Sequence, residues 1–280
     1  MDAVYPLTQE ISRFGWLIRE STSEFGRFIL FAADVIGRFL AAPARCMRWS
    51  LLGPQFYAVG VASIPVVAIT GAFIGMILAL EGFAQFAALG QESRLGSVIN
   101  ISVTKQIGPV LAAVMVAGRV GGALAAELGT MAVTEQLDAM RAMDADPLRI
   151  LVAPRVVACI VMTPLLTIYS DLLGAWGAWF VTVGVYGVPS TDYWFFTAQV
   201  LEWWDPVSGL LKSVAFGAAI GFISCYKGFT CSAGAQGVGR AATASFVASF
   251  IAIIIMNLVL AKFFSTLYVL VTGSRTVFIS

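Results

Sequence analysis

The sequence predicts an all-α integral membrane protein with an N-terminal amphipathic helix at the membrane interface, five transmembrane helices and a short cytoplasmic helix between spans two and three. Its 280 residues are 59% hydrophobic and only 12% charged, and the mean hydropathy is +0.87. Soluble domains carry roughly 25% charged residues, so this composition indicates that lipid is the solvent. The clearest segment is Val61–Leu80, which has no charged residue and the length of about 20 residues that crossing the hydrocarbon core requires.

Residues 1–56 are expected to form a cytoplasmic or interfacial region built around an amphipathic helix. Apolar residues recur at helical spacing from Phe25 to Leu40, while charged residues from Glu20 to Arg38 fall on the opposite stripe. The alternative is a sixth, imperfect span. Each charge at the bilayer centre would then cost roughly 2.5–3.5 kcal/mol, which disfavours a crossing.

Residues 57–280 are expected to form the transmembrane domain, after a turn at Gly53-Pro54. Five apolar segments follow one another in this domain. An odd number of crossings places the two termini on opposite sides of the membrane. The segments are Val61–Leu80, about Ile99 to Gly122, about Val156 to Val185, about Val207 to Tyr226 and about Phe246 to Val271.

The distribution of positive charge predicts the orientation of the chain. The N-terminal region and the segments after spans two and four together carry twelve Arg and Lys residues, whereas the opposite side carries three. Arg and Lys accumulate on the cytoplasmic side of membrane proteins. We therefore expect a cytoplasmic N-terminus and an external C-terminus.

The segment between spans two and three, residues 127–149, is unusually polar and reads ELGTMAVTEQLDAMRAMDADPLR. Val133, Leu137 and Met140 follow helical spacing on one face, and Asp146-Pro147 ends the pattern because the residue before proline avoids the helical region. The sequence thus predicts a short amphipathic helix over about residues 130–145. The residues alone leave open whether it is an interfacial connector or a docking helix for a protein partner.

Several classes of chemistry are excluded or disfavoured. The chain has no histidine, which excludes His-based metal sites and Ser-His-Asp triads. It lacks the G-x-x-x-x-G-K-[ST] phosphate loop, and its GVGRAA run at 237–242 follows a membrane helix rather than a strand. We expect no cofactor and no catalytic site, so an intramembrane enzyme is disfavoured. A self-sufficient secondary transporter is the main alternative, although no internal inverted repeat is visible.

The polar segment and its flanks resemble a known family. Residues 117–155 read AGRVGGALAAELGTMAVTEQLDAMRAMDADPLRILVAPR, and this run closely resembles the MlaE/YrbE-like permeases of MCE-type (mammalian cell entry) ABC transporters. Weaker similarity at GAFIGMILALEG (71–82), GPVLAAVMVAGR (108–119) and GVGRAATASFV (237–247) extends it over about residues 50 to 270.

The resemblance implies a non-catalytic permease subunit in the bacterial inner membrane that forms a homodimer. It implies a cytoplasmic ATPase with a small regulator as partners, an MCE-domain protein outside, and lipid, in particular phospholipid, as the substrate. The polar helix would then be a coupling helix that inserts into the ATPase. Its expected contact residues are Glu135, Gln136, Asp138, Met140 and Arg141.

Polar residues inside the spans are expensive in lipid and usually face a cavity, a partner or a pathway. We infer that Lys105, Gln106, Lys212 and Asn257 approach a common outward-opening cavity, where the two lysines hold a lipid phosphate. An internal polar network that only fastens helices is the alternative. Some relatives have carboxylates in place of Gln106 and Asn257, so a shared salt bridge or proton-linked step is in doubt here.

Two further features leave alternatives open. The small-xxx-small pairs Gly71/Gly75 and Gly217/Gly221 let helices approach closely, either within one subunit or at a dimer seam. Asp171 in span three either pairs with a lysine or caps a helix break near glycines 174 and 177.

Overall fold

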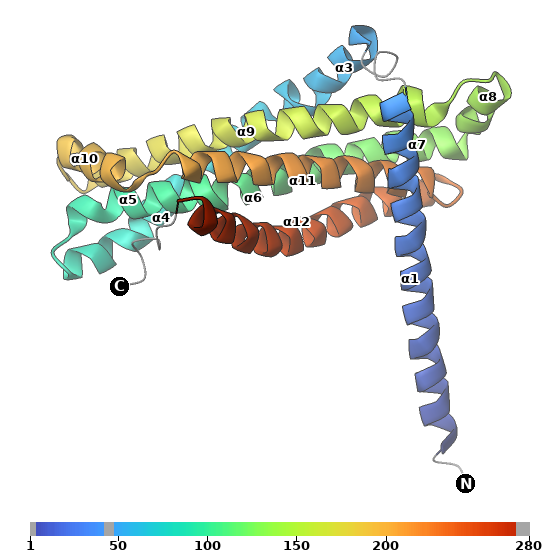
Figure 1. Ribbon diagram of the computed structural model, residues 1–280, viewed down its shortest axis with the longest axis horizontal. Coiled ribbons are helices and arrows are strands. Elements are labelled where there is room, and N and C mark those ends of the chain that lie inside the picture. The colour runs from blue at the N-terminus through green and yellow to red at the C-terminus, as the bar shows by residue number, and fades with distance from the viewer. Residues whose placement is uncertain (1–3, 42–47, 273–280) are drawn as a thin grey trace.

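The computed structural model describes residues 4–41 and 48–272, and every regular element in these ranges is helical. Long helices run side by side as a bundle, and the first helix runs across one end of it (Figure 1). The α-helices are α1 (Val4–Ala41), α3 (Trp49–Val59), α4 (Ile64–Ala88), α5 (Leu95–Ser102), α6 (Gly108–Val116), α7 (Gly122–Val133), α8 (Gln136–Ala142), α9 (Ala153–Trp179), α10 (Ser190–Val200), α11 (Trp204–Phe229) and α12 (Ala235–Thr272). Short 3₁₀ and π segments connect several of them: η1 (Val61–Ser63), η2 (Glu92–Arg94), η3 (Val103–Ile107), η4 (Ala117–Gly121), η5 (Leu148–Val152) and η6 (Phe180–Val185).

The expected five spans are confirmed within the described residues. Each is a helix, or a stack of helices joined by 3₁₀ or π turns, that is long and apolar enough to cross a membrane. The segments that the charge distribution assigned to one side, α1, α8 and the α11–α12 connection, lie at the same end of the bundle (Figure 1). The five spans cover Trp49–Ala88, Glu92–Val133, Leu148–Val185, Trp204–Phe229 and Ala235–Leu270.

Helix α9 is the central element, and glycines bring α4 and α11 onto it. A Cβ on Gly75 would lie 1.9 Å from the Gly174 carbonyl oxygen, and one on Gly217 would lie 2.4 Å from that of Cys159. These helices therefore touch backbone to backbone, an approach that only glycine allows. The glycine pairs pack helices within one chain, as the first of the two sequence interpretations held.

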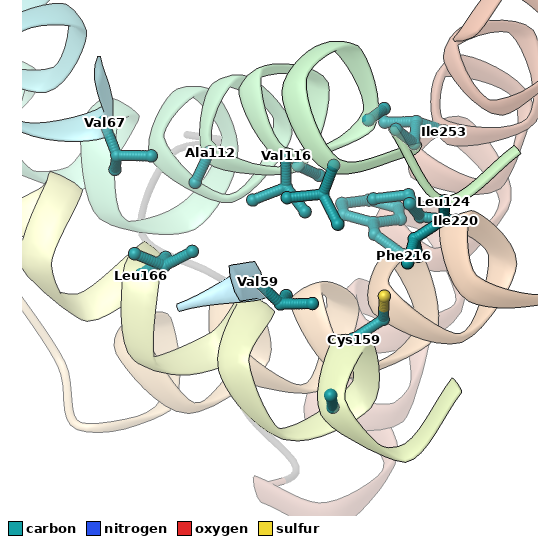
Figure 2. Close-up of a cluster of buried hydrophobic side chains, with 14 residues drawn as sticks. Val59, Val67, Ala112, Val116, Leu124, Cys159, Leu166, Phe216, Ile220 and Ile253 are labelled. Carbon is teal, nitrogen blue, oxygen red and sulfur yellow. The ribbon is translucent and has the colours of Figure 1, made fainter. Parts of the chain in front are cut away.

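The largest buried cluster lies where α3, α4, α6, α7, α9, α11 and α12 meet. Figure 2 shows its side chains interdigitating between the helices, with Phe216, Ile220 and Ile253 fully buried. The outer faces of the spans are apolar, unlike the surface of a soluble protein. Large apolar side chains such as Phe73 and Leu258 are more than half exposed there. This pattern is typical of helices that face lipid.

Helix α1 packs on the end of the bundle instead of running beside the spans (Figure 1). Val35 is buried, and Phe31 packs against the rings of Tyr226 and Phe229 at the end of α11. The apolar residues Phe25 and Leu40 remain largely exposed. This arrangement fits an interfacial helix rather than a sixth span.

The turn predicted at Gly53-Pro54 is wrong, because both residues lie inside α3. The chain breaks instead at Gly60, where α3 ends and a 3₁₀ turn leads into α4. Hydropathy does not locate such a break, because the apolar run continues through it. The predicted boundary between residues 56 and 57 falls within α3, and the division into two regions stays a prediction.

Candidate functional site

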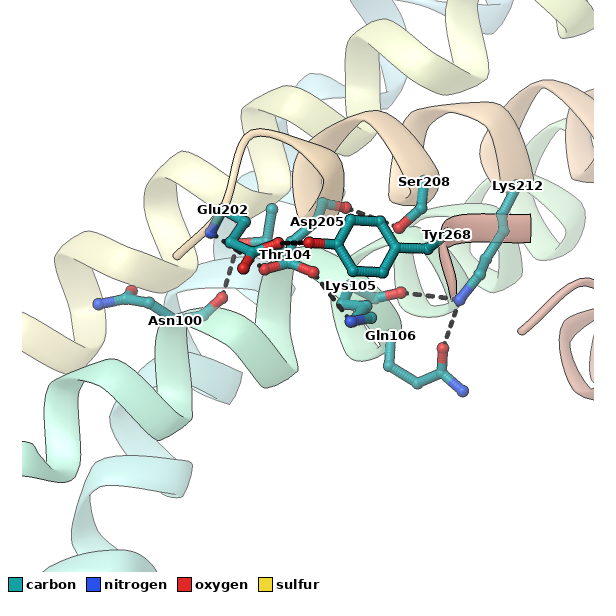
Figure 3. Close-up of polar contacts among 9 residues, drawn as sticks. All are labelled: Asn100, Thr104, Lys105, Gln106, Glu202, Asp205, Ser208, Lys212 and Tyr268. Carbon is teal, nitrogen blue, oxygen red and sulfur yellow. Dashed lines mark hydrogen bonds and ion pairs between the residues drawn. The ribbon is translucent and has the colours of Figure 1, made fainter. Parts of the chain in front are cut away.

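The predicted polar residues of spans two and four meet at the bundle end opposite α8. Lys212 of α11 donates hydrogen bonds from Nζ to the Lys105 carbonyl oxygen at 2.9 Å and to Gln106 Oε1 at 2.6 Å. Figure 3 shows the Lys212 side chain extending from α11 to η3. Lys212 is buried, with only 2% of the residue exposed. Gly209, one turn earlier on α11, leaves room for the Thr104 carbonyl, which brings the two helices close enough for this contact.

A second contact in the same cluster was not foreseen. Lys105 Nζ lies 2.9 Å from Asp205 Oδ1, and the Asp205 side chain is 8% exposed whereas that of Lys105 is 43% exposed. The other carboxylate oxygen of Asp205 accepts the Glu202 backbone N–H at 3.2 Å. The Tyr268 hydroxyl of α12 donates to the Glu202 carboxylate, which joins α12 to the start of α11 (Figure 3). In the sequence, Glu202 and Asp205 flank Trp203-Trp204, but no local pattern indicates which residues these two acids contact.

Asn257 lies on α12 at a depth comparable to that of this cluster, and it forms no hydrogen bond with the cluster. Ser245 Oγ of α12 donates a hydrogen bond to Ser224 Oγ of α11, so these two residues lie at the same depth. The two helices run in opposite directions, and Asn257 comes as many residues after Ser245 as Lys212 comes before Ser224. At the common rise of about 1.5 Å per residue, Asn257 and Lys212 therefore lie at comparable depth. Asn257 Oδ1 is buried and has no hydrogen-bond partner among the described residues.

Both expectations for Asp171 are wrong. Helix α9 continues unbroken through Gly174 and Gly177, so there is no break to cap. Within the described ranges Asp171 forms no ion pair, and its Oδ1 atom is buried without a hydrogen-bond partner. The carboxylate lies against Gly108, where an added Cβ would be 1.7 Å from Oδ1. The carboxylate thus fills the space that this glycine leaves between spans two and three.

Helix α10 lies between spans three and four and is hydrogen-bonded to α5. Asn100 of α5 donates from Nδ2 to the Tyr193 hydroxyl at 3.1 Å and to Thr197 Oγ1 at 3.3 Å. Burial raises the pKa of Tyr193 to about 12, although the hydrogen bond from Asn100 opposes this shift. Trp194 and Trp203 are exposed, as an aromatic belt requires.

The polar helix between spans two and three exists, but it is shorter than predicted. Helix α7 ends at Val133, Glu135 adopts a left-handed conformation with φ 59°, and α8 covers only Gln136–Ala142. The left-handed residue separates α7 from α8, so the predicted helix over 130–145 is not continuous. Leu137 is buried at 5% exposure and anchors α8 to the bundle.

Four of the five predicted coupling residues are exposed on or beside α8. Glu135, Gln136, Asp138 and Arg141 face solvent, while Met140 is half-buried. Arg141 donates from Nη1 to Asp138 Oδ1 at 2.7 Å. The helix therefore presents a polar surface with an internal ion pair.

Ion pairs fix the ends of the segment that carries α8. Arg155, whose side chain is only 6% exposed, pairs with Glu127 at 2.9 Å and joins the start of α9 to α7. Asp146 accepts the Leu148 N–H at 3.1 Å and is paired with Arg38 of α1. Because α7 and α9 belong to spans two and three, α8 connects these two spans.

The Lys105–Asp205 pair predicts an asymmetric effect on stability. Lys105→Met leaves the Asp205 carboxylate buried without a cation and is expected to destabilise the chain by about 3 kcal/mol. Asp205→Asn leaves a half-exposed ammonium that water can solvate, and it should cost only about 1 kcal/mol. Unfolding midpoints of the purified variants in detergent measure the difference, and equal losses would contradict the assigned ion pair.

Comparisons with known proteins agree with these features. A family model described as Permease MlaE matches residues 52–263. A probable ABC transporter permease protein of Rickettsia bellii is 41% identical over 239 residues, which are 85% of this chain and 91% of the relative. A probable ABC transporter permease protein of Synechocystis is 40% identical over 207 residues, or 74% and 79% of the two chains.

A third relative has a name that states a substrate. The intermembrane phospholipid transport system permease protein MlaE of Haemophilus influenzae is 33% identical over 253 residues, which are 89% of this chain and 95% of the relative. The family match covers most of the chain, and the five spans agree with a multi-pass membrane permease. This chain therefore belongs to the MlaE permease family.

Proposed function

We propose that this chain is the membrane-spanning subunit of an ABC transporter that moves phospholipid between the inner membrane and the cell envelope, driven by a separate cytoplasmic ATPase. The observation that carries the proposal is α8, a short polar helix exposed at one end of the bundle and held by spans two and three. A chain without a phosphate loop needs an external source of energy, and α8 offers a surface through which to receive it.

In this proposal the ATPase binds α8, and its contact residues there are Glu135, Gln136, Asp138, Met140 and Arg141. Nucleotide-driven closure of the ATPase moves α8, and the movement passes into spans two and three because α7 and α9 are tied by the Arg155–Glu127 pair. This mechanism requires α8 and the N-terminus to be cytoplasmic, as the Arg and Lys distribution predicts.

Two copies of the chain are proposed to enclose the lipid path. The outer faces of α4 and α12 carry rows of exposed apolar side chains, enough for both a dimer seam and contact with lipid. The opposite bundle end, with α10 and its exposed tryptophans, is proposed to face an MCE-domain protein outside. A small cytoplasmic regulator would act on the ATPase rather than on this chain. The exposed residues include Ile69, Phe73, Ile77 and Leu80 on α4 and Ile251, Ile255, Leu258 and Val259 on α12.

The outer polar cluster is proposed to contact the phospholipid head group. Lys105 is the most accessible cation of the cluster, and Lys212 uses two of its three N–H donors within the protein. Gln106 and Asn257 supply amides at comparable depth, and the unpartnered Asn257 Oδ1 is available to accept a hydrogen bond. The cluster thus both fastens α11 to η3 and leaves polar groups for a ligand.

The proposal is tested by reconstituting the chain with its ATPase in liposomes and following a labelled phospholipid. Movement should require ATP, and both Lys212→Ala and Asn257→Leu should slow it by about tenfold, because each removes a polar contact to the head group. Neither variant should lose its ATPase partner, since both residues lie far from α8.

Two outcomes would contradict the proposal. Lipid movement by the chain alone, without ATPase or ATP, would favour the self-sufficient secondary transporter. Full activity of both variants would reduce the outer cluster to a structural network. As a matched control, Thr266→Val removes a polar group from the exposed side of α12 and should leave transport unchanged.

A further inference from the structure

A cavity of about 630 Å³ lies between the start of α3 and the connection from α8 to α9. The proposed transport path does not use it. It lies at the bundle end that carries α8, and two separate parts of the chain form its wall. The lining residues are Arg48, Ser50, Leu51, Asp144, Ala145, Asp146, Arg149 and Ile150.

The charges around this cavity favour an anion. Arg48 and Arg149 form no ion pair within the described part of the chain, and the Arg149 Nε atom is buried without a hydrogen-bond partner. Of the two acids, Asp146 is already paired with Arg38 and accepts the Leu148 N–H. The four charged lining residues sum to zero, but only the Asp144 carboxylate opposes the two free guanidinium groups, so the potential beside these groups is positive.

The backbone of α3 adds to this positive potential. Arg48 is the N-cap residue of α3 and its side chain forms no capping hydrogen bond. The Leu51 and Leu52 N–H groups donate to the Arg48 carbonyl oxygen, which leaves the first two N–H groups of α3, those of Trp49 and Ser50, to attract an anion together with the helix dipole. The Ser50 hydroxyl, which also lines the cavity, is a further donor.

The depth of the cavity indicates which anion reaches it. Trp49, directly after Arg48, is 75% exposed, and tryptophan is enriched at the level of lipid head groups. Helix α1, with its exposed apolar residues, packs beside the same segment through Arg38 and Asp146. The cavity therefore opens where the phosphate groups of the adjacent leaflet are expected.

We propose that this cavity binds the phosphate group of an anionic phospholipid from the leaflet beside α1 and α8, with Arg48 and Arg149 as its ligands. The guanidinium groups hold the phosphate oxygens in the bidentate manner that suits arginine. The bound lipid fastens α3 to the segment that carries α8. Binding at this site does not depend on the proposed transport, and the bound lipid is not the transported one.

The test uses the full chain in detergent and measures retained lipid by native mass spectrometry and the unfolding midpoint. Phosphatidylglycerol, phosphatidylcholine and inorganic phosphate are compared at equal ionic strength. The wild type is expected to retain phosphatidylglycerol about tenfold better than phosphatidylcholine. Arg48→Gln combined with Arg149→Gln should abolish this preference, whereas Arg240→Gln, an exposed arginine on α12, should keep it.

Asp144→Asn provides a variant with the opposite expected sign. Asp144 has a left-handed backbone with φ 58°, which asparagine also tolerates, so the fold is preserved. Removing its charge should strengthen retention of phosphatidylglycerol about threefold. Equal retention in all variants, or no preference for the anionic lipid in the wild type, would overturn the site. Stabilisation by inorganic phosphate to the same degree would assign the cavity to free phosphate instead of lipid.

Discussion

Reversing two charges on α8, by Glu135→Lys with Asp138→Lys, is expected to abolish association with the ATPase while the chain still inserts into the membrane. Both side chains are exposed, so the change alters the surface offered to a partner and not the core. A lysine at position 138 would stand beside Arg141, which now pairs with Asp138, and would turn an ion pair into a repulsion. Juxtaposed like charges cost several kcal/mol at an interface, so co-purification should fall at least about 100-fold.

The control for this experiment lies at the opposite end of the bundle. Glu92→Lys changes the charge in η2 by the same amount per site and should leave ATPase association intact. A lysine at position 135 meets the same left-handed backbone as glutamate, so strain in the helix is unchanged. Normal co-purification of the double variant would remove α8 from the ATPase interface.

Replacing Gly75 by alanine is expected to prevent stable folding. The added Cβ would lie 1.9 Å from the Gly174 carbonyl oxygen and 2.9 Å from the Gly174 Cα, so α4 and α9 would have to move apart. Overpacking typically lowers stability by about 1–3 kcal/mol. Because the Gly174 backbone cannot rotate away as a side chain could, we expect Gly75→Ala to cost about 3 kcal/mol or more. The yield of monodisperse protein and its unfolding midpoint in detergent measure the loss.

A second glycine provides the matched comparison. Gly239 lies near the start of α12, and an added Cβ there would meet no atom within 4 Å. Gly239→Ala should therefore leave stability unchanged or raise it by about 0.5–1 kcal/mol, since glycine weakens a helix. A fully stable Gly75→Ala variant would show that α4 and α9 do not touch backbone to backbone.

Local patterns of hydropathy predicted most of the fold. The number of spans follows from the length and spacing of apolar runs, whereas the sequence left open whether the glycine pairs pack helices within one chain or at a dimer seam. The breaks were missed, because Gly60 and Glu135 depend on the backbone conformation of single residues. Residues on either side of such a break have the same apolar or amphipathic character, so periodicity does not reveal it.

The polar cluster was predictable only in part. Lys105, Gln106 and Lys212 stood out because each is costly in lipid, and the structure joins all three. The pairing of Lys105 with Asp205 was not foreseen, because the two residues are about a hundred positions apart and their contact depends on how α11 docks against η3. A single sequence carries no signal for such a long-range pairing.

The two π segments of span two determine how this span responds to the insertion or deletion of a residue. Each π-turn accommodates one residue more than an α-helical turn, and η3 carries both Lys105 and Gln106. Deleting one residue there would convert the wide turn into an ordinary α-helical turn, so α5 and α6 could keep their places while the side chains within η3 would shift around the helix axis. The Lys212 contacts to Lys105 and Gln106 depend on this wide turn, so we expect a deletion in η3 to break them even where the span itself is preserved.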